Sequence, residues 1–147
     1  MTAGALRFSE DDYHRYIHAF NTRDYAGLER FFAEDFVLEN AGFAVRGKPA
    51  FREFYAFFHA YCHEEVVFKG FYPGRDGFVA NVMIRFTGLQ ALSQGVLDAK
   101  GYPGMTPIPV GATVEVEFLI LYLLDGQGMI RHIKGAVWVP EVPAGGA

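Results

Sequence analysis

The chain contains one cysteine, no long hydrophobic run and no cluster of basic residues. Cys62 stands alone among 147 residues, so an intrachain disulfide is impossible and a reducing compartment is expected. The longest apolar run, Phe118 to Leu124, is far shorter than the roughly 20 residues that a membrane helix needs. The segment Met1 to Asp12 has no basic stretch followed by an apolar run, which a signal peptide would show. We therefore expect a cytoplasmic protein without a membrane partner.

Positive charge is also scarce. The sequence has 13 Lys and Arg residues against 17 Asp and Glu residues, which gives a formal net charge of −4. Binding to nucleic-acid phosphates requires clustered basic side chains, so we expect no nucleic-acid partner. Apolar residues make up 51% of the chain and charged residues 20%, a balance that argues against disorder. We expect a single domain over residues 1–147, with its core at about 10–139 and a tail at 140–147.

Aromatic residues, in contrast, are abundant, with 15 Phe and 8 Tyr. Such rings bury large areas in a core and also line pockets for flat ligands. For any single ring the core is the simpler interpretation. Their number in so small a domain still makes a hydrophobic ligand pocket a hypothesis to follow.

Apolar spacing predicts three helices in the first half of the chain. The segment 9–12 has a capping-box pattern, and the residues that follow it through Phe20 form one apolar helical face. A short second helix is expected around 28–32. The third is expected to open at 48–49, where a proline stands near the first helical position, and to carry an apolar stripe to Cys62.

Alternating side chains and turn residues predict strands in the rest of the chain. They are expected at 36–40, 43–46, 66–72, 78–87, 113–124 and 129–139. Residues 88–109 are rich in Gly, Pro and polar residues and have no clear period, which predicts a long loop or lid. Helices followed by antiparallel strands indicate an α+β class.

Three stretches carry a family resemblance when they are taken in order. They are Arg15 to Asn21 with Asp24 to Leu28, Phe32 to Asn40 with Arg46 to Tyr55, and Pro109 to Gly111 with Asp125 to Ile130. Over about residues 10–138 the chain resembles the nuclear transport factor 2-like superfamily, particularly its SnoaL-like and ketosteroid-isomerase-like members. The resemblance implies a cone-shaped α+β barrel, with three N-terminal helices on a strongly curved, mostly antiparallel sheet around a deep pocket. It leaves the activity open, because this fold includes isomerases, cyclases, dehydratases, epoxide hydrolases, lyases and non-enzymatic binders.

Two positions gain a candidate role from the resemblance. Tyr16 matches the ketosteroid isomerase tyrosine that donates a hydrogen bond to a substrate carbonyl, although it could equally be a core aromatic. Asn40 stands where that enzyme has its catalytic aspartate, but an amide cannot act as a general base. Similarity to limonene epoxide hydrolase implies that Asn40 holds a substrate or water; a turn residue before 41–42 is the alternative. Strand alternation turns Glu39 to the opposite face.

The expected strand at 78–87 offers two alternating sets of side chains. In the register of the epoxide hydrolase, the set with Asn81, Met83 and Arg85 faces the pocket, where Arg85 could bind an anion or pair with a carboxylate. A register shifted by one residue would turn both polar side chains toward solvent instead.

The last two strands carry candidate acid–base groups. His132 and Lys134 share a face, and either could move a proton, since histidine titrates near neutrality and a desolvated lysine can become a base. Glu115 and Glu117 share a face of the preceding strand and could pair with them across the sheet. The alternative is a solvent-facing or interface cluster. Relatives place an aspartate on the last strand, whereas Gly135 and apolar neighbours stand here, which argues against the usual epoxide hydrolase mechanism.

Two histidine pairs have the i, i+4 spacing of metal ligands, His14 with His18 and His59 with His63. Neither pair has an evident third ligand, and both lie off the apolar stripes of their helices. We therefore expect no metal, and no sequence motif indicates a cofactor.

These patterns favour a cofactor-independent enzyme that performs acid–base chemistry on a hydrophobic, aromatic or polycyclic, oxygenated small molecule. Isomerisation, cyclisation, dehydration and retro-aldol cleavage all fit. Tyr16 would polarise an oxygen, and His132, or else a carboxylate of Glu115 or Glu117, would move the proton. A non-catalytic ligand-binding or scaffold domain is the alternative, which Asn40 supports. The predicted pocket is lined by Tyr16, Leu38, Asn40, Phe54, Phe58, Met83, Arg85 and Phe118, with Asn81 helping to orient the ligand.

The strand at 113–124 also predicts a partner, because its segment 118–124 is apolar on both faces. One face can pack into the core, while the other, with Leu119, Leu121 and Leu123, would lie in water. A contiguous exposed apolar patch usually marks an interface, so we expect a homodimer through the open face of the sheet. The alternative is that the 88–109 loop covers this patch within one chain.

Overall fold

The computed structural model describes residues 7–40, 43–105 and 107–139. Its elements are α1 (Glu10–Asn21), α2 (Tyr25–Glu29), β1 (Phe32–Asn40), β2 (Phe43–Arg46), α3 (Lys48–Tyr61), β3 (Cys62–Pro73), β4 (Gly77–Gly88), α4 (Gln94–Lys100), β5 (Thr113–Leu124) and β6 (Ile130–Trp138). The expected turn at 41–42 and the expected tail at 140–147 lie outside the described residues. None of the described helices is long and apolar enough to cross a membrane.

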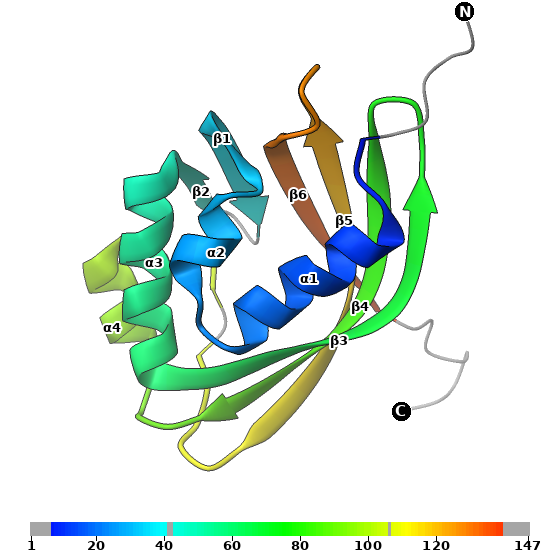
Figure 1. Ribbon diagram of the computed structural model, residues 1–147. Coiled ribbons are helices and arrows are strands. Elements are labelled where there is room, and N and C mark those ends of the chain that lie inside the picture. The colour runs from blue at the N-terminus through cyan, green and yellow to red at the C-terminus, as the bar shows by residue number, and fades with distance from the viewer. Residues whose placement is uncertain (1–6, 41–42, 106, 140–147) are drawn as a thin grey trace, which may run out of the picture.

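The strands form one curved sheet in the order β2-β1-β6-β5-β4-β3 (Figure 1). Every neighbouring pair is antiparallel except β1 and β6, which run parallel. The α+β class and the mostly antiparallel, curved sheet are therefore confirmed. β2 and β3 remain as the two edges of the sheet, so the expected barrel is open rather than closed.

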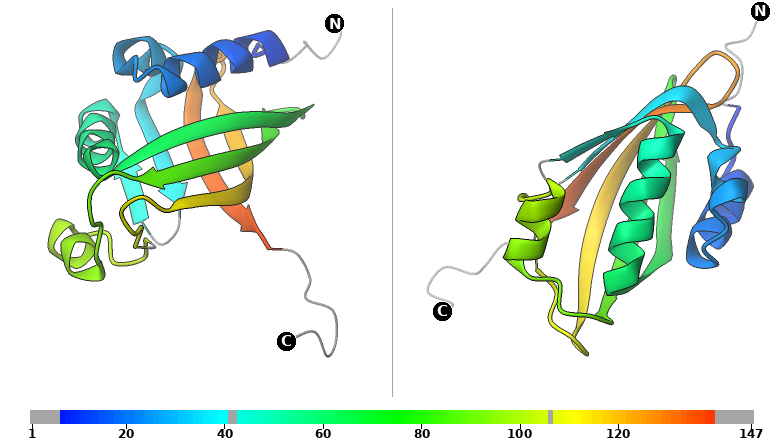
Figure 2. Two further views of the ribbon diagram at one scale, coloured as in Figure 1. Left: turned by 90° about the horizontal axis from the view of Figure 1, so that it is seen from below. Right: turned by 90° about the vertical axis from the view of Figure 1, so that its left-hand side faces the viewer.

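Helices α1, α2 and α3 cover the concave face of this sheet, and the opposite face carries no helix among the described residues (Figure 2). α1 begins with the expected capping box, in which the Ser9 hydroxyl accepts from the Asp12 N–H and the Asp12 carboxylate accepts from the Ser9 N–H. That backbone hydrogen bond lowers the pKa of Asp12. The apolar face of α1 then buries Tyr16 and Phe20 against the sheet.

The second helix and the first strand differ from the sequence prediction. α2 ends at Glu29, and Phe32 belongs to β1 instead of the helix. The reason is tertiary packing: Phe32 stacks on Phe36 with ring centroids 4.2 Å apart and pairs with Ile130 of the parallel neighbour β6. A propensity for helix is weaker than burial of this kind.

The segment predicted as a loop at 88–109 contains a short helix, α4, capped by the Ser93 side chain. Leu97 of this helix is completely buried. Tyr102, just after it, packs its ring against Phe54 and Phe43. The segment therefore folds onto the helical side of the sheet, and it does not cover Leu119 and its neighbours on the other face.

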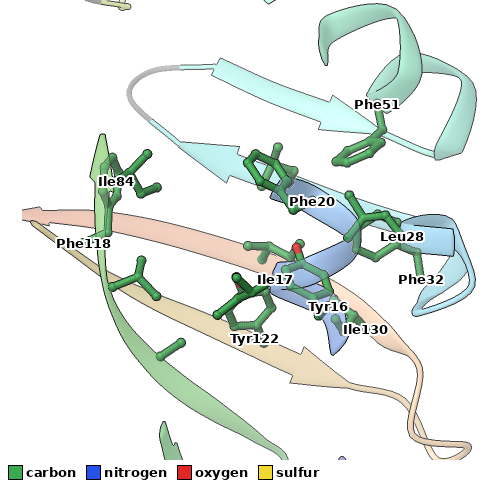
Figure 3. Packing of buried hydrophobic residues seen from close by; sticks show 14 of the residues in the cluster. Tyr16, Ile17, Phe20, Leu28, Phe32, Phe51, Ile84, Phe118, Tyr122 and Ile130 are labelled. Carbon is green, nitrogen blue, oxygen red and sulfur yellow. The ribbon is translucent and has the colours of Figure 1, made fainter. Parts of the chain in front are cut away.

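Figure 3 shows part of the core, including Tyr16 of α1 beside Tyr122 of β5. Further aromatic rings from α1, β4 and β5 meet next to Tyr122. Phe78 stacks on Tyr122 at 4.7 Å and on Phe8 at 4.7 Å, and Tyr13 meets both Phe78 and Tyr122 edge-on. Such stacked and edge-to-face pairs contribute beyond the area they bury. Tyr13 and Tyr122 also line the cavity described below, so this cluster forms one part of its wall.

β4 and β5 approach each other closely at Gly77, beside this cluster, which leads to a prediction about stability. Gly77 is buried, and a Cβ there would overlap the carbonyl oxygen of Tyr122 and approach the Leu123 Cα to 3.0 Å. We expect Gly77→Ala to lower the free energy of unfolding by about 2 kcal/mol or more, because backbone must move to relieve the overlap. The matched control is Gly126→Ala, where the added methyl meets nothing within 4 Å. Urea unfolding of both variants measures the difference; equal loss of stability in the two would contradict this packing.

Candidate functional site

A cavity of about 350 Å³ lies between the helices and the concave face of the sheet. The predicted lining residues that reach it are Tyr16, Leu38, Asn40, Phe54, Phe58 and Phe118. Most of the wall is aromatic or aliphatic. The polar side chains in the wall are Asn40, Glu64 and the tyrosines of α1, α3 and β5. The cavity is thus apolar with a few polar groups, which is typical of small-molecule sites.

Met83 and Arg85 do not reach the cavity, because β4 has the other register. Ile84 and Phe86 face inward and line the cavity, and the set that includes Asn81 faces outward. Asn81 donates to the carboxylate of Glu117 at 2.9 Å, and Arg85 pairs with Glu65 at 2.9 Å and with Glu115 at 3.6 Å. The predicted carboxylate pairing of Arg85 is present, but on the outer face. Burial of the bulkier apolar set decides the register.

The candidate acid–base groups of β5 and β6 also lie on the outer face. His132 contacts the Glu39 carboxylate at 2.6 Å, and this hydrogen bond lowers the pKa of Glu39. Glu117 pairs with Lys69 at 3.1 Å. The predicted pairing of Glu115 or Glu117 with His132 or Lys134 is not formed, because the register sets Lys134 opposite Leu121. Strand alternation does turn Glu39 away from Asn40, as predicted.

Tyr16 projects from α1 into the cavity, with 8% of its surface exposed. Its ring meets that of Tyr122 edge-on at 5.6 Å (Figure 3). The Tyr122 hydroxyl in turn lies 3.1 Å from the Tyr13 hydroxyl. Burial raises the pKa of Tyr16, and the neighbouring Tyr13 adds to the effect. The Tyr16 phenol therefore stays protonated at neutral pH and can donate a hydrogen bond to a ligand oxygen.

Asn40 reaches the cavity from the end of β1, and its side chain lies close to Gly135 of β6. A Cβ at Gly135 would lie only 3.1 Å from the Asn40 side-chain carbon. The glycine therefore leaves room for the amide in the cavity wall. This pair occupies the places where the resemblance would put carboxylates, and it supplies hydrogen-bonding capacity without a charge.

A buried carboxylate that the sequence analysis overlooked stands in the same cavity. Among the described residues, Glu64 is the only charged side chain that is buried. Its Oε1 lies 3.0 Å from His59 Nε2, and both side chains are only 6% exposed. A lone buried carboxylate is costly, and this hydrogen bond offsets part of the cost.

His59 has a second partner on its other ring nitrogen, because the Tyr25 hydroxyl lies 2.6 Å from Nδ1. The ring is also held by aromatic neighbours, Phe20 edge-on at 5.6 Å and Tyr55 at 5.0 Å. Tyr25, His59 and Glu64 thus form a continuous chain of hydrogen bonds from α2 to the cavity. Burial raises the pKa of Tyr25, which favours its protonated form as the donor to Nδ1.

The start of β3 is fixed in place by the turn between α1 and α2. Asn21 donates to the Val66 carbonyl at 3.0 Å and accepts from the Val66 N–H at 2.9 Å. Arg23 donates to the Glu64 carbonyl at 2.8 Å, from a backbone with φ of 60°. Such a conformation is uncommon for a residue other than glycine and persists only where contacts hold it. These bonds fix the direction of Glu64.

Two sequence signals could have identified this site. The first is the alternation of side chains from Cys62: because β3 begins at Cys62 and not at Val66, Glu64 points to the same buried face as Cys62. The second concerns His59. His59 lies one helical turn after Tyr55, so the prediction that His59 lies off the apolar face of α3 is wrong. Cys62 is buried, as the apolar stripe of α3 predicted. Its burial raises the pKa of the thiol to about 12, and the nearby Glu64 adds to this effect.

Met105, Pro107 and Ile108 also line the cavity, which makes the segment after α4 part of its wall. The described residues contain no group of three or more His, Cys, Asp or Glu that could hold a metal ion. The polar groups that face the cavity are the Glu64 carboxylate, the Asn40 amide and the protonated phenols of the tyrosines. This set can accept a proton and stabilise charge on a ligand oxygen.

Comparisons with known proteins bear on the family. The SnoaL-like domain model matches residues 13–130. No curated protein matches the chain significantly. Similar solved structures include a protein of Silicibacter sp. TM1040 proposed to be a polyketide cyclase, with 20% identity, a TM-score of 0.69 and 88% of each chain covered.

Two further similar structures are of proteins with a named ligand. Rv0760c of Mycobacterium tuberculosis, in complex with estradiol-17β-hemisuccinate, has 17% identity and a TM-score of 0.63, with 86% of this chain and 90% of the other covered. A computationally designed 17-OHP binder has 18% identity and a TM-score of 0.62, with 86% and 89% covered. The fold and the match over residues 13–130 agree: the chain has the nuclear transport factor 2-like fold and belongs to the SnoaL-like domain family.

Proposed function

We propose that the chain binds a flat, hydrophobic, oxygenated molecule in the cavity and catalyses proton transfer on it. Isomerisation, cyclisation, dehydration and retro-aldol cleavage share this requirement for a base and an oxygen-binding donor. The observation that carries the proposal is the buried Glu64 carboxylate in the wall of an otherwise largely apolar cavity, close to protonated phenols.

In this proposal Glu64 takes the proton, in the role that the sequence suggested for His132, Glu115 or Glu117. Tyr16 donates a hydrogen bond to the ligand oxygen on which negative charge develops. Asn40 orients a second polar group of the ligand from the far strand. Transfer of a proton from a carbon next to a carbonyl to the Glu64 carboxylate leaves an enolate, whose charged oxygen is more stable when it accepts a hydrogen bond in a site that excludes water.

The size and chemistry of the cavity support a polycyclic or aromatic ligand. A volume of about 350 Å³ is at the lower end of the range of about 300–1,000 Å³ for small-molecule sites. The steroid ligands of the M. tuberculosis protein and of the designed binder support the same class. The one buried charge among the described residues is negative, so the part of the ligand next to Glu64 should be uncharged or cationic.

A non-catalytic binding domain is the second candidate, and Asn40 favours it. An amide at that position removes the base that the resemblance would place there. A binder would hold the same ligand with Glu64 as a hydrogen-bond acceptor and would convert nothing. Turnover, and not binding, therefore separates the two candidates.

We expect turnover of at least one member of a panel of ketones, epoxides and lignin-like aromatics. Tyr16→Phe should lower kcat/KM by about 10²-fold or more, and Glu64→Gln by about 10²- to 10⁴-fold, with the fold retained by circular dichroism. The matched controls are Tyr72→Phe, an exposed phenol, and Glu65→Gln, the next residue on the outer face. His132→Ala should also be neutral. Unchanged rates in Tyr16→Phe and Glu64→Gln would reject the site.

We also propose that two copies pair through the outer face of the sheet. Leu119 is 41% exposed and lies on the same face of β5 as Leu121 and Leu123. The register places Val79 of β4 beside Leu121, which extends this apolar strip. Ion pairs such as Lys69–Glu117 border this apolar strip. A closed two-fold dimer would bury the strip, with the polar groups at its rim.

Leu119→Glu should shift such a dimer toward monomer, because it places a charge within the apolar strip that the dimer would bury. The matched control is Ala26→Glu, which adds the same charge to an exposed position of α2 on the helical side. Sedimentation equilibrium at micromolar concentration distinguishes the states. A wild-type mass near the 16.4 kDa of one chain would exclude the dimer.

A further inference from the structure

The hydrogen-bond chain behind the cavity has a direction that follows from its chemistry. Tyr25 is half-buried, and its hydroxyl meets His59 Nδ1 at 2.6 Å. When Nδ1 accepts the phenolic hydrogen, a neutral imidazole carries its own hydrogen on Nε2. Nε2 then donates across 3.0 Å to Glu64 Oε1. All the donors point the same way, toward the carboxylate.

A carboxylate in an apolar cavity tends to pick up a proton, because burial disfavours its charged form. A hydrogen bond to the ionised form works against this tendency. In the other tautomer of His59, the bare Nε2 lone pair would face Glu64 and favour a protonated carboxyl. The tautomer of His59 therefore decides whether Glu64 is ready to accept a proton.

We propose that Tyr25 and His59 are positioning residues that hold Glu64 ionised and aim it into the cavity as the general base. This inference rests on the proposed function, in which Glu64 takes the proton. Tyr25 fixes the His59 tautomer, and His59 donates to one carboxylate oxygen, which leaves the other oxygen for the ligand. Phe20 and Tyr55 pack against the imidazole, with ring centroids 5.6 Å and 5.0 Å from it, and restrict its movement.

The other ionisable groups around Glu64 do not replace this donor. Tyr16, Tyr55 and Cys62 interact with Glu64 electrostatically, and burial raises the pKa of all three, so each is neutral. Arg23 is a cation close to Glu64, but its guanidinium donates to the backbone carbonyls of Glu64 and Phe20 and contacts His63, and no hydrogen bond joins it to the Glu64 carboxylate among the described residues. His59 is the side chain that bonds the carboxylate itself.

The pH dependence of turnover tests the inference. Loss of the His59 donor makes the Glu64 carboxylate harder to form, so the rising limb of the pH profile of kcat/KM should move to higher pH. We expect a shift of about 1 pH unit or more in His59→Leu and a smaller one in Tyr25→Phe. Activity lost at pH 6 should then be largely regained at high pH. His59→Gln, whose amide can still donate, should keep the limb near its wild-type position.

The control is Tyr61→Phe, which removes a half-buried phenol at the end of the same helix as His59 and outside the cavity wall. A purely structural role would lower the whole profile of His59→Leu without moving its rising limb. That result would overturn the inference, as would a Tyr25→Phe profile identical to that of Tyr61→Phe.

A measurement on the ligand-free protein separates this inference from the proposed function. The Glu64 carboxyl signal, assigned in ¹³C NMR by comparison with Glu64→Gln, should titrate at higher pH in His59→Leu than in wild type. If no panel compound is converted but the signal moves, the catalytic proposal fails and the control of Glu64 by His59 stands. If turnover occurs and the signal does not move, His59 does not set the state of Glu64 and the inference fails.

Discussion

The hydrogen bond between His59 and Glu64 joins the end of α3 to the start of β3 and keeps a carboxylate inside a cavity. Isolated burial of a carboxylate would cost several kcal/mol. A chain that only needed a stable core would do better with an apolar residue at that position. The partners that surround Glu64, with Tyr25 behind His59 and Arg23 on the backbone, are therefore best understood as the support of a functional group.

The curved sheet separates two kinds of chemistry. Its concave face carries apolar side chains, protonated phenols and Glu64, whereas its outer face carries ion pairs such as His132–Glu39 and Lys69–Glu117. The outer pairs are half-exposed or exposed and contribute little to stability. Strand alternation makes this separation strict, since a residue on one face cannot reach the other without a change of register.

The sequence alone allowed much of the fold to be predicted, because helical stripes, the capping box at Ser9 and the long strands β4 and β5 are strong local signals. Tyr16, Asn40, Phe54 and Phe58, which the sequence placed in a pocket, lie in the cavity wall. Phe32 was misplaced because its pairing partner lies near the other end of the chain. The choice of which β4 side chains face inward was wrong. Both alternating sets contain apolar residues, so the local sequence does not distinguish the inner set from the outer set, and only the packing of the folded chain does.

Glu64 was missed for a related reason. Its role depends on His59 and Tyr25, which approach it only through the folding of α2 and α3. A charged residue in a polar segment such as 63–65 would ordinarily be assigned to solvent. Local patterns report which face a residue takes, and they do not report which distant side chains meet there.

A crystal structure with a bound polycyclic ketone would test the central claim most directly. The account predicts that the ligand fills the cavity, with its ketone oxygen within about 3 Å of the Tyr16 hydroxyl and an adjacent carbon facing the free oxygen of Glu64. A ligand bound on the outer face near His132, or one inside the cavity whose oxygen meets neither Tyr16 nor its phenol neighbours, would contradict it.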